Sequence, residues 1–514
     1  MNSKRMPKIK AVIATGLASL MSSTGVTAQT DPGVRGGPPG AGNIIAGTNY
    51  NETASFLEGK LRAEELEATC DGCSDVTPGS DTGQDPNLAT ITSSAGLGAR
   101  HNADQCTVCH TQPAIGGSGG FLVPNPKADP SNFRRPENPM FDLIPHRNWQ
   151  TNTVPSFITQ FGPIREARFK FLRDSNGNLT TTRDGGVHQL FTIVGRDTNT
   201  DGRDDPIVAG CTNAVLPQTD FEREVAENNI SFRIPLQMFG MGLIDSIQDK
   251  EILKRHDTTA AQREVVGIEG IPNRSGNDGT ITRFGWKAQN KSLTVFAGEA
   301  YNVENGVTNE LFPQPTSGIN ECNGPQKPHP NDITRTADTD EDNESFFNPM
   351  HILADWMQFS LFMRFLDGPQ RAPVNASITR GEKLFENTDP NSANFVGCAL
   401  CHTPEMKTAA TMGGSGALEN KTVSLYSDLL VHHMGNGLMD DIVQGAAGPD
   451  QFRTTPLWGL GQRIFFLHDG RTNDLLTAIQ AHSSANSEAN AVITSFNALS
   501  NSQKQDILNF LRSL

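Results

Sequence analysis

The sequence lacks long apolar runs, an excess of positive charge, and cysteine near its start. A bilayer-spanning helix needs about 20 apolar residues; the apolar stretch at 11–21 is far shorter, and no other segment approaches that length. We therefore expect no membrane anchor. Acidic residues outnumber basic ones, 57 to 42, and the formal charge is −15. This balance disfavours nucleic acid or an anionic membrane surface as a partner and favours a basic protein.

The first 28 residues resemble a secretory signal peptide. Four of the first ten residues are basic, the apolar stretch follows, and Val26-Thr27-Ala28 supplies the small residues of a cleavage site. No cysteine lies near this point to accept a lipid. We predict a mature chain that begins after Ala28 and is exported without an anchor.

The rest of the chain is long enough for two or three domains with apolar cores. It is rich in glycine and proline, with 49 Gly and 31 Pro in 514 residues, and these interrupt the helix- and strand-forming runs. We expect modest secondary structure joined by long, shaped loops.

Four of the eight cysteines belong to two copies of one pattern, Cys-x-x-Cys-His. The copies are Cys106-Thr107-Val108-Cys109-His110 and Cys398-Ala399-Leu400-Cys401-His402. This spacing lets two thiols form thioethers with one haem while the next imidazole ligates its iron. The sequence therefore predicts two covalently bound c-type haems with His110 and His402 as proximal ligands. A shared zinc site is disfavoured because the pairs are far apart and each has its own histidine.

The other four cysteines are expected to form disulfides, since they are even in number and the chain is expected to be exported. They are Cys70, Cys73, Cys211 and Cys322. Their connectivity stays open, and a thiol-redox role for the Cys70–Cys73 pair is the alternative.

One string occurs after each haem signature. Phe232-Arg233-Ile234-Pro235-Leu236 is echoed by Phe452-Arg453-Thr454-Thr455-Pro456-Leu457, which indicates two homologous haem domains. The polar stretch at 323–344 is the expected join. We therefore predict domains at 29–330, with insertions, and at 345–514.

Apolar periodicity predicts three helices in the C-terminal domain, at 378–385, at 474–482 with Asn473 as its cap, and at 502–514. A haem signature among such helices is typical of a cytochrome c domain. The expected fold is therefore mainly α with long irregular loops, arranged as two cytochrome c-like haem domains.

The N-terminal domain also contains the first half of a calcium loop. Asp197, Asn199 and Asp201 alternate ahead of Gly202, but Val208 stands where the closing glutamate belongs. Bound Ca²⁺ and a solvated loop are both compatible with this pattern.

These features together resemble the di-haem oxidoreductase family labelled thiol oxidoreductase-like, a branch of the bacterial di-haem cytochrome c peroxidases. Besides the haem signatures, the resemblance is carried by Gly96-Leu97-Gly98, 152–155, 162–169, 185–188, 284–287 and Phe466-Leu467-His468-Asp469-Gly470-Arg471. It implies a periplasmic redox protein with one reactive haem and one electron-transfer haem.

The resemblance also implies a sixth ligand for the second haem. In the superfamily this ligand follows the histidine of a His-x-Gly string by fourteen residues, which here leads from His468 to His482, where peroxidases usually have methionine. Imidazole in place of a thioether predicts a low-spin haem of comparatively low potential. A core histidine bonded to a backbone carbonyl is the alternative.

Peroxidases often supply a distal histidine shortly after the first haem signature, but residues 111–145 contain no histidine here. The resemblance therefore implies that the first haem keeps an open iron position. Glu166, Arg165 and His188 are the candidates for the acid/base and the cation that O–O cleavage requires, although surface or structural roles would explain each of them. The alternative ligands that would close the site are His146, His256 and the pair His432-His433. Trp286 and Trp458 are candidates for packing on the porphyrins or for relaying electrons between them.

We therefore expect a periplasmic, peroxidase-like di-haem oxidoreductase that takes electrons from a small redox protein such as a cytochrome c and reacts with peroxide. One alternative is an oxygenase that binds dioxygen, as in the similar di-haem rubber oxygenases. The other is a non-catalytic electron carrier in which both irons are six-coordinate.

Overall fold

The computed structural model describes residues 29–64, 66–67, 93–94, 98, 100–103, 105–119, 138–142, 152–192, 218–314, 316, 353–410 and 414–514. Several predictions fall outside the described residues: the signal peptide at 1–28, the join at 323–344, the calcium-loop residues Asp197, Asn199 and Asp201, the cysteines Cys70, Cys73, Cys211 and Cys322, and His146. Among the described residues, no helix is long and apolar enough to cross a membrane.

Twelve α-helices are found in the described residues. They are α1 (Tyr50–Glu64), α2 (Pro139–Asp142), α3 (Phe221–Ala226), α4 (Met241–Asp245), α5 (Asp249–Thr258), α6 (Ala260–Val266), α7 (Leu293–Glu304), α8 (Asp355–Phe365), α9 (Ala376–Phe385), α10 (Leu475–Gln480), α11 (Asn490–Ala498) and α12 (Asn501–Leu511). Both haem signatures begin in single 3₁₀ turns, η1 (Cys106–Val108) and η5 (Cys398–Leu400).

The strands are short and form six small sheets in the described part of the chain. The pairs are β1 (Leu66–Glu67) with β2 (Ser93–Ser94), β3 (Arg100–His101) with β8 (Phe191–Thr192), β5 (Phe171–Arg173) with β6 (Leu179–Arg183), β10 (Met406–Lys407) with β11 (Thr422–Val423), and β12 (Val431–His433) with β13 (Gln451–Arg453). The one three-stranded sheet has β4 (Glu166–Phe169) between β7 (Val187–His188) and β9 (Ile230–Arg233).

The predicted mainly α class is wrong, because the described part of the chain is mixed, with 32% helix and 14% strand. The strands contain two to five residues each, too few for an alternating pattern to be recognised in the sequence. They form where distant loops meet and satisfy one another's backbone groups, as when β4 pairs with β9.

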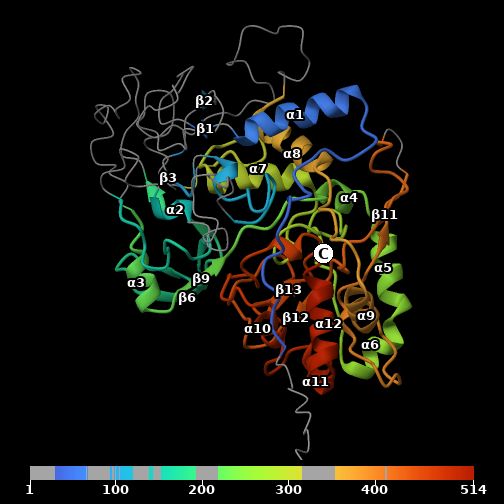
Figure 1. Ribbon diagram of the computed structural model, residues 1–514. Helices are drawn as coiled ribbons and strands as arrows, with labels where there is room; N and C mark the ends of the chain where they lie inside the picture. The colour runs from blue at the N-terminus through green and yellow to red at the C-terminus, as the bar shows by residue number, and fades with distance from the viewer. Residues whose placement is uncertain are drawn as a thin grey trace, which may run out of the picture.

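The largest apolar core joins the N-terminal helix to residues beyond position 350. Helix α1 packs along α8, and α7 packs on the same helix, so that the three form the upper layer of Figure 1. Gly59 permits the close approach, since a Cβ there would lie 2.2 Å from the carbonyl oxygen of Gln358. Phe56 and Phe362 meet across this contact with ring centroids 5.4 Å apart. The two predicted domains thus share one core.

The three helices predicted in the C-terminal part are confirmed, with shifted ends, as α9, α10 and α12. Helix α10 is capped by Asp474, whose side chain accepts a hydrogen bond from the backbone N–H of Thr477 at 2.6 Å, and not by Asn473. This helix ends at Gln480, so His482 lies just beyond it. Helices α9 and α12 pack together around a second apolar core, below the first in Figure 1.

Candidate functional site

Each haem signature lines its own cavity in the described part of the chain. The cavity at Cys106–His110 has a volume of about 170 Å³, and the cavity at Cys398–His402 about 220 Å³. Mostly apolar side chains line both. The repeated strings form corresponding walls: Ile234, Pro235 and Leu236 line the first cavity, and residues 452–457 line the second.

The second cavity places His402 in the form that a metal ligand needs. Its Nδ1 lies 3.1 Å from the carbonyl oxygen of Tyr426, which can only accept, so Nδ1 carries the proton and Nε2 has a free lone pair. Burial, together with the neighbouring imidazole of His482, lowers the pKa of His402 to about 4. The ring is therefore neutral at physiological pH.

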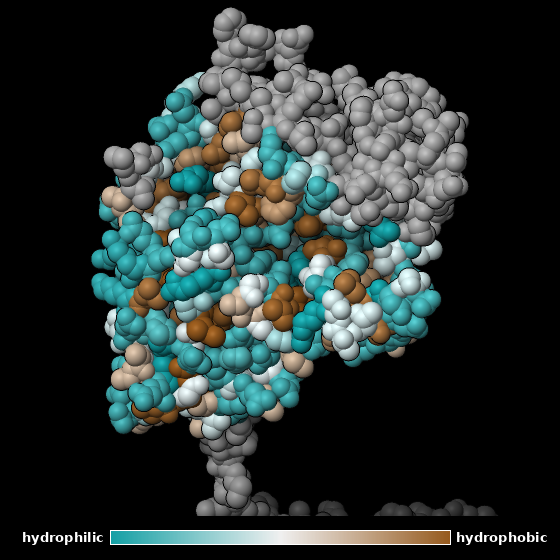
Figure 2. Space-filling view, turned by 180° about the vertical axis from the view of Figure 1, so that it is seen from behind, coloured by the Kyte–Doolittle hydropathy of each residue, from teal (hydrophilic) through white to brown (hydrophobic). Residues whose placement is uncertain are grey.

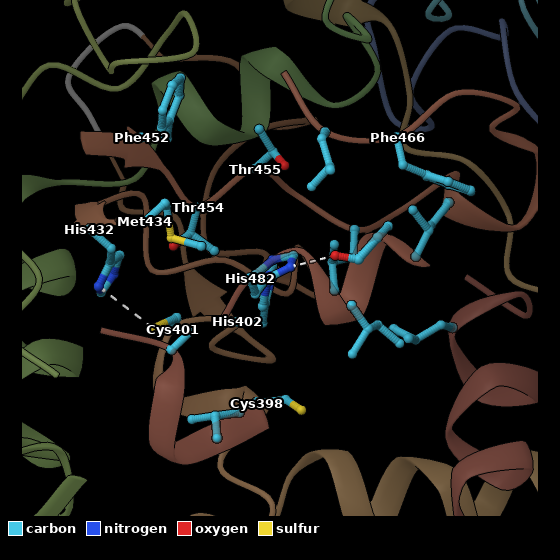
Figure 3. A pocket seen from close by; sticks show the side chains of 18 of the residues that line it. Cys398, Cys401, His402, His432, Met434, Phe452, Thr454, Thr455, Phe466 and His482 are labelled. Carbon is cyan, nitrogen blue, oxygen red and sulfur yellow. Dashed lines mark hydrogen bonds between the residues drawn. The ribbon is translucent and has the colours of Figure 1, made fainter. Parts of the chain in front are cut away.

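His482 lines the same cavity, and Figure 3 shows the two imidazoles together at its centre. Its Nδ1 donates to the carbonyl oxygen of Ala478 at 2.8 Å, and burial lowers its pKa. This bond is the one expected of a core histidine, but it also fixes the tautomer with Nε2 free, as a haem ligand requires. The structure thus brings His482 to Cys398, Cys401 and His402, and its ligand role stays a prediction.

The first cavity has one histidine from its signature. The Nδ1 of His110 lies 3.1 Å from the carbonyl oxygen of Gly117, which again leaves Nε2 free, and burial lowers the pKa of this ring. Backbone hydrogen bonds from Gly116 to His110 and from Gly119 to Cys109 close the loop that carries it. Like His402, His110 is therefore held by its own chain as a neutral ligand.

Three glutamates also line the first cavity, Glu299 within α7, Glu166 on β4 and Glu304 at the end of α7. Glu166 forms an ion pair with Arg168, and Glu304 accepts a hydrogen bond from Asn102 Nδ2 at 2.8 Å. Burial and the adjacent charge of Glu166 raise the pKa of Glu304 to about 8. The pair therefore holds a proton at neutral pH, as expected of two close carboxyl groups.

Of the predicted distal residues, the structure brings Glu166 and Arg165 to the first cavity. Arg165 Nε donates to the carbonyl oxygen of Asp469 at 3.0 Å. His188 does not line this cavity: its Nε2 lies 2.8 Å from Asp184, and its ring stacks on Phe169 at 3.7 Å. Glu304 was not predicted, because nothing in the sequence sets it apart from other acidic residues at a helix end.

The alternative ligands lie elsewhere in the described structure. His432 is held between Asp428 and Glu488, at 2.9 and 2.7 Å, and lines the second cavity. The other two are His433, which bonds to Asp450 at 3.0 Å, and His256, which bonds to the Glu269 carbonyl oxygen at 3.2 Å. None of the three lines the first cavity.

Trp286 lines both cavities. Its Nε1 donates to the carbonyl oxygen of Ile234 at 2.9 Å, and its ring meets His468 edge-on at 6.4 Å. His468 in turn stacks on Phe452 at 4.3 Å. Trp458 lines neither cavity and packs instead over Gly240.

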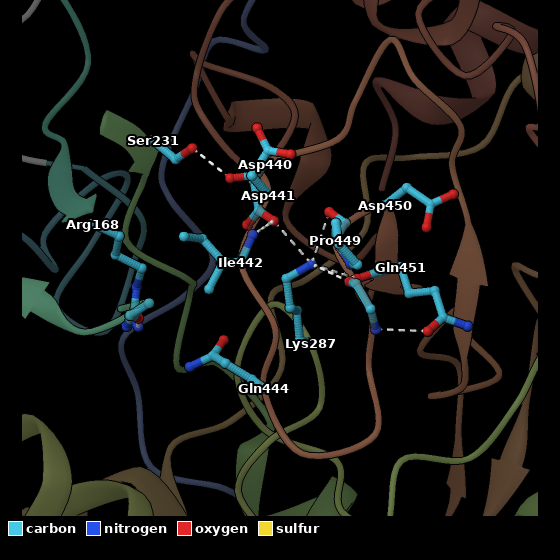
Figure 4. A network of polar contacts seen from close by, with 12 residues as sticks. Arg168, Ser231, Lys287, Asp440, Asp441, Ile442, Gln444, Pro449, Asp450 and Gln451 are labelled. Carbon is cyan, nitrogen blue, oxygen red and sulfur yellow. Dashed lines mark hydrogen bonds and ion pairs between the residues drawn. The ribbon is translucent and has the colours of Figure 1, made fainter. Parts of the chain in front are cut away.

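The next residue, Lys287, makes polar contacts that join the segments around the two cavities (Figure 4). Its fully buried Nζ lies 3.0 Å from Asp440 and 2.9 Å from the carbonyl oxygens of both Gly448 and Gln451. It also lies 4.0 Å from the ring centroid of Phe452. Asp440 also pairs with Arg233, which lines the first cavity, at 2.7 Å. Burial lowers the pKa of Lys287 to about 8.

Comparison with known proteins identifies the family. The model of the family described as "Di-haem oxidoreductase, putative peroxidase" matches residues 181–514, about two thirds of the chain. The chain belongs to the di-haem oxidoreductase family. The match includes the second haem signature and begins after the first.

No curated protein matches this di-haem oxidoreductase. A solved structure of Kuenenia stuttgartiensis hydrazine synthase pressurised with 20 bar xenon is 17% identical, over 33% of this chain and 56% of its own, with a TM-score of 0.19. The aligned part is thus little more than half of that protein, and a likeness at this level supports no structural argument.

The residues of both cavities fit the haem that the family implies. In each, two cysteines and a neutral histidine with a free Nε2 face an apolar space. The second cavity is also lined by Arg453 and Arg463, which are buried and carry no carboxylate partner among the described residues. Such guanidinium groups suit a ligand that brings carboxylates.

Lys287→Met is expected to destabilise this di-haem oxidoreductase by about 3–5 kcal/mol, since it leaves buried acceptors without their cation. Denaturant unfolding of the haem-loaded protein at neutral pH measures the change. Lys291→Met is the matched control, because Lys291 pairs with Asp278 at the surface and should contribute less than about 1 kcal/mol. Equal effects of the two substitutions would contradict the role given to Lys287.

Proposed function

We propose that this di-haem oxidoreductase is an exported c-type cytochrome enzyme whose first haem reacts with peroxide and whose second haem transfers electrons. The observation that carries the proposal is the difference between the cavities. The second is lined by His402 and His482, whereas the first is lined by His110 and the carboxyl pair of Glu166 and Glu304. One iron would have two imidazoles and the other an open position beside an acid/base.

In this proposal Cys106 and Cys109 attach the first haem and Cys398 and Cys401 the second. The haem irons supply the electron-transfer chemistry when bound. Glu166 would take a proton from one peroxide oxygen and deliver it to the other oxygen as that oxygen departs, the task of a positioned carboxylate.

Other groups around Glu166 support this proton transfer. Glu304 keeps a second proton beside Glu166, and Arg168 neutralises the remaining carboxylate charge. Arg165 adds a positive charge to the same wall.

Trp286 is the part of the wall that the two cavities share, and we assign it the packing contact through which electrons pass between the haems. The electron donor would be a small basic redox protein such as a cytochrome c. The charge of −15 supports this. The face in Figure 2 is largely hydrophilic, with apolar side chains in separate small groups.

The test uses the full-length protein expressed with haem-maturation machinery. A denaturing gel stained for haem, an EPR spectrum of the ferric protein and a peroxide titration are recorded. We expect a stained band, one high-spin and one low-spin haem, and spectral changes with peroxide at the high-spin haem alone. Two low-spin haems that do not react would favour an electron carrier, and reaction with dioxygen but not peroxide an oxygenase. An unstained band would overturn the proposal.

The pH dependence of stability tests the carboxyl pair. Glu304 has an ordinary pKa of 4.5 when exposed and about 8 in the fold, so the folded state binds more protons between these values. The free energy of unfolding should therefore fall as pH rises through this window. Glu304→Gln keeps an acceptor for Asn102 and should flatten this slope, as measured by denaturant unfolding at about pH 5 and about pH 8.5. Identical slopes in both proteins would argue against the shared proton.

A further inference from the structure

Two arginines on the wall of the second cavity are buried without a carboxylate partner in the described structure. Arg453 is 5% exposed and Arg463 is 8% exposed. Arg453 Nε donates to the carbonyl oxygen of Gly285, and Arg463 Nε to that of Phe465, both at 2.9 Å. Among the described residues, Arg463 Nη2 is buried with no hydrogen-bond partner. An unpaired buried guanidinium is costly, so an anion is expected beside it.

Comparison of the two repeated strings also shows that Arg453 differs from its counterpart in lacking a carboxylate partner among the described residues. Arg233 and Arg453 occupy equivalent places in the two strings. Arg233 is neutralised within the chain by Asp440, at 2.7 Å, whereas burial alone lowers the pKa of Arg453 to about 10. Most other buried arginines are paired, for example Arg512 with Asp31. Arg263 has no ion pair among the described residues, but two of its nitrogens donate to the carbonyl oxygens of His256 and Glu269. Arg453 and Arg463 differ from Arg263 in that they line a cavity, where a ligand can supply the missing negative charge.

The position of these arginines agrees with the orientation of a tethered haem. The two vinyl groups of haem lie on one edge of the porphyrin and the two propionates on the opposite edge. In Figure 3, Phe452 and Thr455 lie on the far side of His402 and His482 from Cys398. Arg453 lies between Phe452 and Thr455 in the chain, and it lines the cavity together with Arg463.

From this arrangement we infer that Arg453 and Arg463 form the binding site for the propionate carboxylates of the second haem. Guanidinium and carboxylate pair by two parallel, charge-assisted hydrogen bonds. The Arg463 guanidinium also lies 5.9 Å from the ring centroid of Trp286. Propionates held by Arg463 would therefore lie near the tryptophan that lines both cavities. The inference rests on the proposed function, since it requires a haem tethered at Cys398 and Cys401.

The test compares Arg453→Gln, Arg463→Gln and the double variant in the full, haem-loaded chain. A nearby cation favours the reduced haem, so each substitution should lower the midpoint potential of the second haem, the double variant most, and leave that of the first haem unchanged. Resonance Raman spectra should show the propionate bending band of one haem shifted. Arg173→Gln, which removes a guanidinium paired with Glu224 and Glu227 away from the second cavity, should change neither readout.

Arg453→Lys and Arg463→Lys keep the charge in case a glutamine variant does not fold. They should preserve the potential while shifting the propionate band, because lysine lacks the planar pair of donors. Unchanged potential and propionate band in all variants, with two haems bound, would overturn the inference alone. A wild-type protein without haem on a stained gel would instead refute the proposed function, so the two failures are distinguishable.

Discussion

Replacing His482 by alanine is expected to convert the second haem from low-spin to high-spin. The imidazoles of His402 and His482 line one cavity, each with its Nδ1 bonded to a backbone carbonyl and its Nε2 free. Loss of one imidazole leaves the iron with five ligands, a weaker ligand field and an accessible position. The low-spin EPR signal should disappear and a second high-spin signal should replace it.

The matched control is His433→Ala. His433 lies on β12 and bonds to Asp450 and Gln451 outside both cavities, so its loss should leave the spectrum unchanged. A His482→Ala protein that keeps its low-spin signal would show that another group ligates the second iron. Addition of free imidazole to the variant should restore the low-spin signal, a recovery that a purely structural histidine would not show.

Replacing Glu166 by glutamine is expected to slow the reaction with peroxide by about 10²- to 10⁴-fold, the usual contribution of a positioned acid/base. Glutamine keeps the size and the hydrogen-bonding oxygen but cannot take up the proton. Stopped-flow spectroscopy at the high-spin haem measures the rate constant. The spectrum of the resting ferric protein should stay nearly the same, because Glu166 is not proposed as a ligand.

Glu224→Gln serves as the control for loss of a buried carboxylate. Glu224 is 5% exposed and pairs with Arg173 at 2.6 Å, away from the first cavity. It should cost stability and leave the peroxide rate within a few-fold of the wild type. A Glu166→Gln protein that reacts at the wild-type rate would remove Glu166 from the mechanism and direct attention to Glu304 or Arg165.

The sequence predicted those parts of the site that depend on local spacing. The Cys-x-x-Cys-His strings need only five neighbouring residues to predict a haem site, and both strings line cavities. His482 was predicted through a fixed interval along the chain, and the structure places it with His402, while its role as a ligand stays a prediction. In each case the residues concerned are close in the sequence or linked by a family spacing.

The parts that the sequence did not predict depend on contacts between distant segments. Glu304 meets Glu166 only because α7 and β4 pack around one cavity. His188 was predicted to lie in the distal pocket, but its contact with Asp184 and its stacking on Phe169 hold it outside the first cavity. The prediction of the fold class was wrong for the same reason. Strands of two to five residues are stabilised by the strands they pair with and not by an alternating pattern in their own sequence.

Lys287 stabilises the region between the two cavities with a positive charge that belongs to the chain itself. Its ammonium group lies among three carbonyl oxygens and one carboxylate, a set of ligands that would also suit a hard metal ion. Below a pH of about 8, where Lys287 keeps its proton, this positive charge belongs to the chain and cannot be stripped by a chelator or exchanged for another ion. The spacing of the two porphyrins would therefore not depend on the ionic composition of the medium around the protein.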